Sequence, residues 1–409
     1  MMDTDLRIEK KKRVPSLRFA GFDGEWEVKR LGEVAEINPS NKNLPNKFIY
    51  IDLESVINGE LLKEKVVLKN ESPSRAQRVL KPNDILFQMV RPYQMNNLFF
   101  DKNGIYVAST GYAQIRTNQS TRFIYQYLHF QKFIDKVIER CTGTGYPAIN
   151  STDLSKIPIN LPTLPEQQKI ASFLTAVDEK LQALKQQKNL LEQYKKGIMQ
   201  RIFSQEIRFK DDNRKAFGEW EMKKLGEVLF EHKKRNEKGK IAEVFSVAKN
   251  KGVINQIEHL GRSYASKITS NYKVVFPYDI VYTKSPTSDF PFGVIKQNKL
   301  ERTGIVSVLY AVFSPVNKDL GFLLDYYFSN PINTFNYLNP LVQKGAKNTM
   351  NISNDDFLYG ATILLPPSEK EQTKIAHFLS AIDEKISHCQ VHITKMEQYK
   401  KGLLQQLFV

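Results

Sequence analysis

An internal repeat constrains this chain of 409 residues more than any other feature. Three segments occur twice in the same order, once in each half. They are GEWEVKRLGEV and GEWEMKKLGEV (24–34 and 218–228), KIASFLTAVDEK and KIAHFLSAIDEK (169–180 and 374–385), and QYKKGIMQRIF and QYKKGLLQQLF (193–203 and 398–408). Because chance does not produce three ordered matches, we predict two related halves. Each half has a constant opening segment, a divergent body and a constant tail.

The two constant tails have the pattern of long helices. Thr163-Leu-Pro-Glu166 and Ser368-Glu-Lys-Glu371 match the S/T-x-x-E capping box, which marks a helix start. Apolar residues then recur every seven positions, which is the pattern of a coiled-coil seam. The seam residues are Ile170, Val177, Leu184, Leu191 and Ile198 in the first tail and Ile375, Ile382, Cys389, Met396 and Leu403 in the second.

A helix with so long an apolar stripe has to bury that stripe against another element. The tails therefore predict a coiled-coil spacer of two helices, which run antiparallel if a pseudo-two-fold axis relates the halves. The alternative is that each helix packs separately on its own body.

The two bodies predict one shared α/β (α+β) fold. Short apolar runs bounded by turn residues, such as 83–90 and 273–283, favour strands, and the runs 123–139 and 321–332 favour helices. The expected division of the chain is a polar tail at 1–15, a first body at 16–160, a first spacer helix at 161–204, a second body at 205–364 and a second spacer helix at 365–409.

The chain is strongly basic, with 60 Lys and Arg against 44 Asp and Glu and a formal net charge of +16. This charge favours a polyanionic partner, nucleic acid first, although many basic proteins have no such partner. No apolar run is long enough for a membrane span, the segment 1–15 lacks the pattern of a secretion signal, and Cys141 and Cys389 are too few for a disulfide framework. We expect a cytoplasmic protein without a membrane partner.

The order of these motifs resembles the specificity subunit of type I restriction–modification systems. The opening GEWE-x-x-x-LGEV, an Asp-Ile pair at a strand start (Asp84-Ile85 and Asp279-Ile280), a glycine loop, KIA-x-FL…DEK and QYKKG follow one another twice, over nearly the whole chain. The resemblance implies two target-recognition domains that each read one half of a split DNA site. It also implies that the antiparallel spacer docks two methyltransferase subunits, and that restriction and translocase subunits join the complex.

Two basic bodies on a stiff spacer can engage one DNA duplex at two places. Phosphate contacts supply affinity, whereas side chains at base edges supply sequence information. Half-sites that face one protein surface should lie about one helical turn apart, ~34–36 Å. Since the two bodies differ in sequence, we expect a bipartite and asymmetric target.

Two loops in each body are the candidate DNA contacts: the loop after the Asp-Ile strand and the glycine loop. Arg and amide side chains read base edges, and glycine lets the backbone approach phosphate closely. Any one of these residues could instead be an ordinary solvated surface group. The candidates are Gln88, Arg91, Tyr93, Gln94, Gly143, Thr144, Gly145 and Tyr146 in the first body and Thr283, Lys284, Ser285, Lys344, Lys347 and Asn348 in the second.

Motifs of catalysis are missing from the sequence. It has no [DNS]-P-P-[FYW] tetrad and no Walker A motif, and the lone Gly143-Thr-Gly145 is weak evidence for an AdoMet loop. His388 and His392 flank Cys389 at helical spacing, but the first half has no counterpart, so we expect no metal site.

The prediction is therefore a non-catalytic subunit with no cofactor of its own. By the resemblance, AdoMet, ATP and Mg bind to partner subunits, which give the complex its methyltransferase and ATP-dependent endonuclease activities. The alternatives are a coiled-coil adaptor whose bodies bind proteins and a stand-alone DNA methyltransferase.

Overall fold

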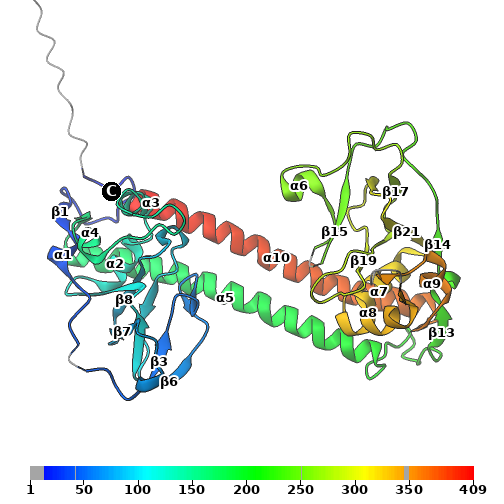
Figure 1. Cartoon of the computed structure of the whole chain (residues 1–409), viewed down its shortest axis with the longest axis horizontal. Coiled ribbons are helices and arrows are strands. Elements are labelled where there is room, and N and C mark those ends of the chain that lie inside the picture. Colours follow the sequence, from blue (N-terminus) through cyan, green and yellow to red (C-terminus); the bar gives the residue numbers. More distant parts are fainter. Residues whose placement is uncertain (1–12, 42, 250, 345–349) are drawn as a thin grey trace, which may run out of the picture. The chain divides into compact units, whose positions relative to one another are not determined.

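The computed structural model describes residues 13–41, 43–249, 251–344 and 350–409. The chain divides into two compact units (Figure 1). The first unit contains Met1–Gln186 and Cys389–Val409, and the second contains Gln187–His388. Each unit therefore holds one body and parts of both long helices. Most of the expected polar tail at 1–15 lies outside the described residues.

The body of the first unit is built on two four-stranded sheets and three short helices. One sheet has the order β2-β11-β8-β9 and the other has the order β6-β3-β10-β7. The strands of the first sheet are β2 (Ala35–Ile37), β11 (Tyr112–Thr117), β8 (Asp84–Gln88) and β9 (Leu98–Phe100). Those of the second are β6 (Lys65–Leu68), β3 (Lys47–Ile51), β10 (Tyr106–Ser109) and β7 (Ala76–Val79). The helices are α2 (Thr121–Tyr127), α3 (Gln131–Ile138) and α4 (Ser151–Ser155).

Smaller elements complete this body. The repeated opening segment forms β1 (Glu27–Arg30) and α1 (Leu31–Val34), and β1 pairs antiparallel with β12 (Pro158–Leu161). A short hairpin joins β4 (Val56–Ile57) to β5 (Glu60–Leu61). Single turns of 3-10 helix occupy η1 (Lys69–Glu71) and η2 (Pro92–Gln94). The predicted single helix at 123–139 is thus two helices, α2 and α3, with a break between them.

The second unit repeats the first sheet. Its order is β14-β21-β18-β19, which matches β2-β11-β8-β9 strand for strand, so the predicted shared fold of this part is confirmed. The strands are β14 (Leu229–Glu231), β21 (Tyr310–Pro315), β18 (Ile280–Thr283) and β19 (Val294–Gln297). As in the first unit, the opening segment forms a strand, β13 (Glu221–Lys224), that pairs with β24 (Thr362–Leu365). The helices are η3 (Leu225–Glu227), α7 (Lys318–Phe328), α8 (Pro331–Leu338), η4 (Asn339–Leu341) and α9 (Asn354–Tyr359).

The rest of the second body differs from the first. Three separate two-stranded pairs and one short helix replace the second sheet. They are β15 (Phe245–Ala248) with β16 (Gly252–Asn255), β17 (Lys273–Val275) with β20 (Gly304–Val306), β22 (Gln343–Lys344) with β23 (Met350–Asn351), and α6 (Gln256–Leu260). The predicted strand at 273–283 is two strands, β17 and β18, because a Pro277-containing turn separates them.

The long helices are α5 (Leu164–Phe203) and α10 (Glu369–Leu407), and they run antiparallel within each unit. In the first unit Asp178 pairs with Lys400 at 2.6 Å and Lys185 pairs with Glu397 at 3.0 Å. Every residue of the predicted seam is buried or half-buried, which is consistent with a seam between the two helices.

The alternative of each helix packing only on its own body is wrong. Trp26 of the first body packs edge-on against Phe408, with ring centres 6.4 Å apart. In the second unit Trp220 packs in the same way against Phe203, also at 6.4 Å. Each helix therefore begins on the body of its own half and ends in the core of the body of the other half.

The acidic residues of the predicted capping boxes have another partner. Glu166 accepts hydrogen bonds from Arg18 Nε at 2.9 Å and Nη2 at 2.8 Å. Glu371 accepts from Arg208 Nη2 at 3.1 Å, so the arrangement repeats in the second unit. These buried carboxylates attach the residues that precede the opening segment of each half to the first turn of its long helix.

Candidate nucleic-acid interface

The loop that follows β8 is held from inside by Gln88. This side chain is 3% exposed, and its Nε2 donates to Val90 O at 2.8 Å and to Gln94 Oε1 at 2.9 Å. Its Oε1 accepts from the backbone N–H of Asn96 at 3.1 Å. The amide of Gln88 is therefore engaged within the protein, where it fixes the shape of the loop that carries the other candidates.

The structure brings the two candidate loops of the first body together. Arg91 donates its backbone N–H to Pro147 O at 2.8 Å, and Ile149 donates to Met89 O at 3.1 Å. The guanidinium carbon of Arg91 lies 4.1 Å from the ring centre of Tyr146, which is 68% exposed. Arg91 is half-buried and its Nε is buried without a hydrogen-bond partner, whereas the Tyr146 ring on which it stacks offers a flat exposed surface.

The remaining candidates of the first body surround this pair. Tyr93 and Gln94 in the loop of Arg91 are exposed, and so are Thr144 and Gly145 in the loop of Tyr146. Gly143 has φ +90°, and a Cβ there would approach Tyr146 O at 3.2 Å. The glycine is therefore required by the backbone of the loop.

In the second unit the corresponding strand end contacts the β22–β23 region. Lys284 Nζ donates to Ile352 O, directly after β23, so the loop after β18 again meets the segment preceding the last short helix. Burial lowers the pKa of Lys284, and the neighbouring charge of Lys273 lowers it further. Thr283 is buried and Ser285 is exposed.

The remaining candidates of the second body are Lys344, Lys347 and Asn348. Lys344 ends β22, and Lys347 and Asn348 lie outside the described residues. Sequence reasoning missed Gly293, where φ is +99° and a Cβ would lie 1.9 Å from Thr283 O. It also did not select the cations at 233–240 as candidates, because they form a run of charge without a recognisable motif.

The helices carry a second candidate surface. Several residues are identical in the two tails although they are exposed, so packing does not explain their identity. Tyr194 and its repeat Tyr399 are each 52% exposed. Gly197 and Gly402 have no heavy atom within 4 Å of a built Cβ. Other identical pairs that are exposed in both tails include Glu179 with Glu384, Lys180 with Lys385, and Lys196 with Lys401.

Each unit assembles one complete copy of this surface. In the first unit the Asp178–Lys400 pair joins the DEK segment of α5 to the QYKKG segment of α10. In the second unit the Asp383–Lys195 pair, at 2.5 Å, joins DEK of α10 to QYKKG of α5. We define these two equivalent surfaces as the DEK–QYKKG faces.

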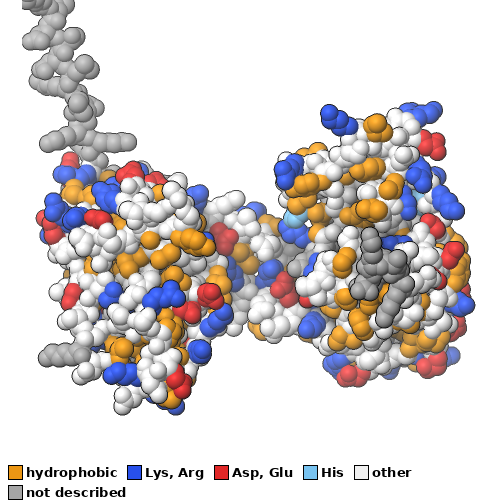
Figure 2. Space-filling model, viewed as in Figure 1, with side chains coloured by type: hydrophobic (Ala, Val, Ile, Leu, Met, Phe, Trp, Pro, Cys, Tyr) orange, Lys and Arg blue, Asp and Glu red, His pale blue; other side chains and the backbone are white. Residues whose placement is uncertain are grey.

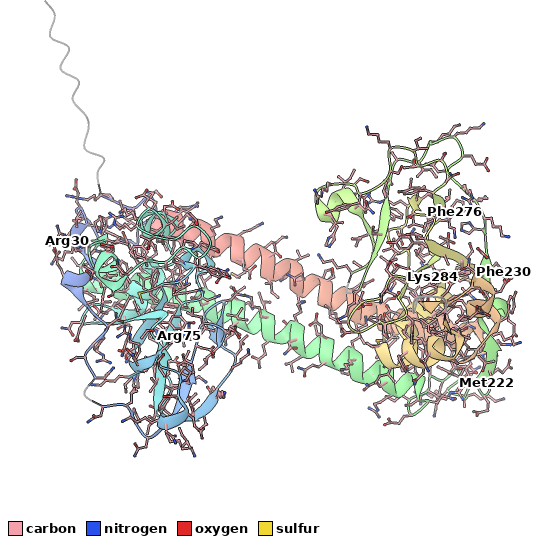
Figure 3. All side chains as sticks on the ribbon, viewed as in Figure 1. Arg30, Arg75, Met222, Phe230, Phe276 and Lys284 are labelled. Carbon is pink, nitrogen blue, oxygen red and sulfur yellow. The ribbon has the colours of Figure 1, made fainter. Side chains whose placement is uncertain are left out.

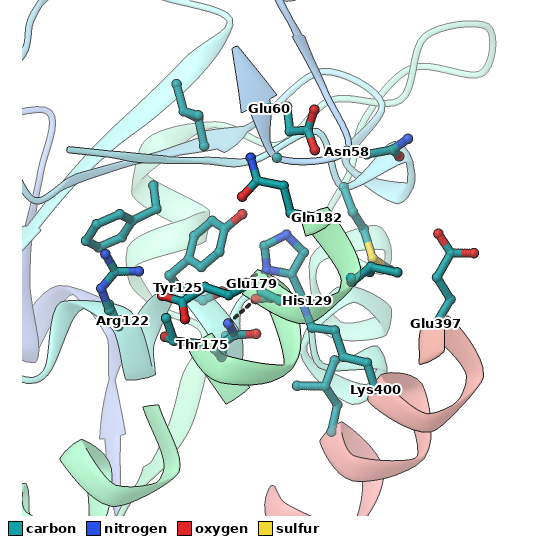
Figure 4. A pocket seen from close by; sticks show the side chains of 18 of the residues that line it. Asn58, Glu60, Arg122, Tyr125, His129, Thr175, Glu179, Gln182, Glu397 and Lys400 are labelled. Atoms are coloured by element: carbon teal, nitrogen blue, oxygen red, sulfur yellow. Dashed lines mark hydrogen bonds and ion pairs between the residues drawn. The ribbon is translucent and has the colours of Figure 1, made fainter. Parts of the chain in front are cut away.

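A cavity of about 870 Å³ adjoins this face in the first unit (Figure 4). The β4–β5 hairpin, α2 and both long helices line it, with Glu179 and Lys401 among its residues. Gln126 Nε2 donates to Asp178 Oδ2 at 2.7 Å at its base. Burial, and then the charge of Lys400, lowers the pKa of His129 to about 4, so this ring is neutral near pH 7.

No cluster of three or more His, Cys, Asp or Glu side chains arranged for a metal ion occurs among the described residues. Cys389 is buried in the helix seam, whereas His388 and His392 are exposed. Within the same part of the chain, every helix is too short or too polar to cross a bilayer.

Comparison with known proteins gives one consistent family. Residues 23–193 match the type I restriction modification DNA specificity domain. The specificity subunit of the type I restriction enzyme HindI from Haemophilus influenzae is 26% identical over 44% of this chain and 41% of its own length. The MjaVIII specificity subunit from Methanocaldococcus jannaschii is 26% identical over 50% of this chain and 49% of its own. These two matches thus span about half the length of the relatives.

Matches over the whole chain also exist. The putative MjaX specificity subunit from Methanocaldococcus jannaschii is 24% identical over 98% of this chain and 97% of its own. Among solved structures, the type I S subunit from M. genitalium has a TM-score of 0.56 at 14% identity, covering 97% of this chain and 99% of that chain. A chain from work on complex assembly and conformational transition of the type I R-M system has a TM-score of 0.53 at 22% identity, covering 94% and 97%. Residues 23–193 thus match the DNA specificity domain, and the whole chain is similar in sequence to a putative type I specificity subunit and in fold to solved S subunits.

Proposed function

We propose that this chain is the DNA-binding subunit of a type I restriction–modification complex and that each body reads one half of a bipartite, asymmetric site. One observation carries the proposal. In each unit the loop that follows the Asp-Ile strand, β8 or β18, contacts the segment that precedes the last short helix of the body. Arg91 stacks on Tyr146 in the first, and Lys284 reaches Ile352 in the second. Different side chains on one repeated framework are suited to reading different half-sites.

The helices supply the fixed distance between half-sites. At 1.5 Å per residue, the 40 residues of α5 extend over about 60 Å. A continuous helix resists bending, so it can act as a spacer that holds the gap constant. We propose the antiparallel pair of α5 and α10 as this spacer.

The two DEK–QYKKG faces dock two copies of one partner, the methyltransferase subunit. Equivalent surfaces bind equivalent partners, which accounts for exposed residues that are the same in both tails. Restriction and translocase subunits then join in the cytoplasm, where the DNA is.

In this proposal the chain itself catalyses nothing. The partners hold AdoMet, ATP and Mg, and an enzyme that methylates a base flips it into its own pocket. A coiled-coil adaptor is the second candidate function, since the tails are exposed and repeated. A steep fall of DNA affinity with salt favours the proposal over the adaptor.

The test is to map methylated bases across the genome with and without this gene. We expect one split, asymmetric motif to lose its methylation when the gene is deleted. An unchanged methylation pattern would contradict the proposal, and AdoMet bound by the purified chain would favour a stand-alone methyltransferase.

A further inference from the structure

An exposed basic segment follows β14 in the second unit. Residues 233–240 read KKRNEKGK, so they hold five cations and a single acid, Glu237. Figure 2 shows Lys and Arg side chains along the edge of this unit. The exposed cations are Lys233, Lys234, Arg235, Lys238 and Lys240. The connection that follows β2 in the first body, residues 38–46, has one lysine.

Hydrogen bonds hold this basic segment against the rest of the second body. Val274 donates to Lys234 O at 3.0 Å and Asn236 donates to Tyr272 O at 3.0 Å, so residues 234–236 run beside β17. The buried side chain of Asn236 accepts from Ile241 N at 3.0 Å and donates to Ile241 O at 3.0 Å. One asparagine therefore closes the turn that displays the last two lysines.

The basic segment is continuous with the candidate reading loop. Arg235 forms an antiparallel bridge with Lys273, whose Nζ donates to Tyr310 O at 2.7 Å. Tyr310 is the strand partner of Thr283, the last residue of β18, and Lys284 follows it. Lys234 stacks on the ring of Phe276. Phe276 and Lys284 are labelled in Figure 3. Lys273 and the β21–β18 strand pair thus connect the segment to Lys284 in the reading loop.

None of these cations forms an ion pair among the described residues, although Glu231 lies close enough to act on the charges of Lys273 and Lys284. Among the described residues, the ion pairs of the second body use other cations, such as Lys249 with Asp289 and Arg302 with Glu243. Burial lowers the pKa of Lys273, the charge of Glu231 offsets part of this shift, and the charge of Arg235 lowers the pKa further. Cations crowded in this way repel one another, so a bound polyanion relieves the repulsion.

We propose that residues 233–240, with Lys273 at their base, bind the phosphate backbone of the DNA duplex beside the half-site read by the second body. The inference rests on the proposed function and adds a contact that is independent of sequence and that the first body lacks. A phosphate backbone is favoured over an acidic protein because Lys273 and the β21–β18 strand pair connect the cations to the reading loop.

The test measures DNA affinity of the full chain, in complex with its methyltransferase subunits, as a function of KCl concentration. The variant replaces the five cations with glutamine. A control variant replaces five other exposed cations, three just before the second opening segment and two on α10, which keeps the net charge equal. The control positions are Lys210, Arg214, Lys215, Lys370 and Lys395.

Each phosphate contact contributes about 0.9 to the slope of log affinity against log salt, so losing five lowers the slope by about 4.5. We expect this fall in the variant and less than one unit in the control. The preference for the target over scrambled DNA should stay the same, because phosphates carry no sequence information.

A slope that stays within one unit of the wild type would overturn the inference while leaving the proposed function intact. The inference also fails if the control loses as much slope as the variant, or if the variant loses a protein partner instead of DNA affinity. Wild-type complex that shows no salt-dependent binding to DNA would overturn the proposed function as well.

Discussion

Replacing Arg18 with methionine should strongly destabilise the first unit, because the arginine side chain is only 14% exposed and pairs with a buried carboxylate. Arg18 Nε and Nη2 hold both oxygens of Glu166, whose side chain is 2% exposed. Without the arginine the carboxylate is a buried charge with no partner, and breaking such a pair costs about 3–5 kcal/mol. The retained apolar length of methionine limits the loss of packing.

The two tryptophans allow each unit to be measured alone. Trp26 lies in the core of the first unit and Trp220 in that of the second. In a Trp220→Phe background, urea unfolding followed by fluorescence reports the first unit, and linear extrapolation gives its free energy of unfolding. The reciprocal Trp26→Phe background reports the second unit, where Arg18→Met should change little.

Two controls make the reasoning refutable. Arg13 pairs with Glu25 on the surface, both about half exposed, so Arg13→Met should cost less than about 1 kcal/mol. Adding Glu166→Gln to Arg18→Met removes the unpaired charge and should recover at least half of the loss. A cost below about 1 kcal/mol for Arg18→Met, or no recovery in the double variant, would refute the role given to the buried pair.

Three further variants test other parts of the structure. Arg91→Gln should weaken binding to the target DNA by about 1–3 kcal/mol and relax the sequence preference in one half-site only, as seen in binding selections. Gly226→Ala should destabilise the second unit in thermal unfolding, because the new Cβ would lie 2.1 Å from the ring of Tyr359. Tyr194→Ala or Tyr399→Ala should each remove one methyltransferase subunit, measured as the mass of the complex.

Each of these variants has its own contrary result. Equal loss of affinity for all sequences would make Arg91 a phosphate contact. Gly218→Ala, at a glycine with open space around it, is the matched control for Gly226→Ala and should be neutral. Retention of both methyltransferase subunits after either tyrosine change would exclude that tyrosine from the docking face.

Sequence reasoning was most successful where a pattern is local and long. The seven-residue spacing from Ile170 to Ile198 picked out residues that are buried or half-buried, because helix periodicity depends only on neighbours along the chain. Glu166 shows the limit, since the capping-box pattern gave it a local role and its partner Arg18 lies 148 positions away. Contacts across such separations have no signature in spacing.

The candidate site was predicted at the level of loops and only partly at the level of residues. Polar and aromatic residues beside turns pointed to the loop holding Arg91 and the loop holding Tyr146, and the two do meet. Gln88 shows why single residues are harder. All five residues of β8 are buried, so polarity in the sequence did not reveal that its amide faces inward.

The central claim is that each body reads one half of the DNA site. Exchanging residues 35–160 for the body of another specificity subunit, and mapping methylated bases in the resulting strain, tests it most directly. We expect one half of the motif to change while the other half and the gap between them stay the same. A change in both halves, or an altered gap, would contradict the claim.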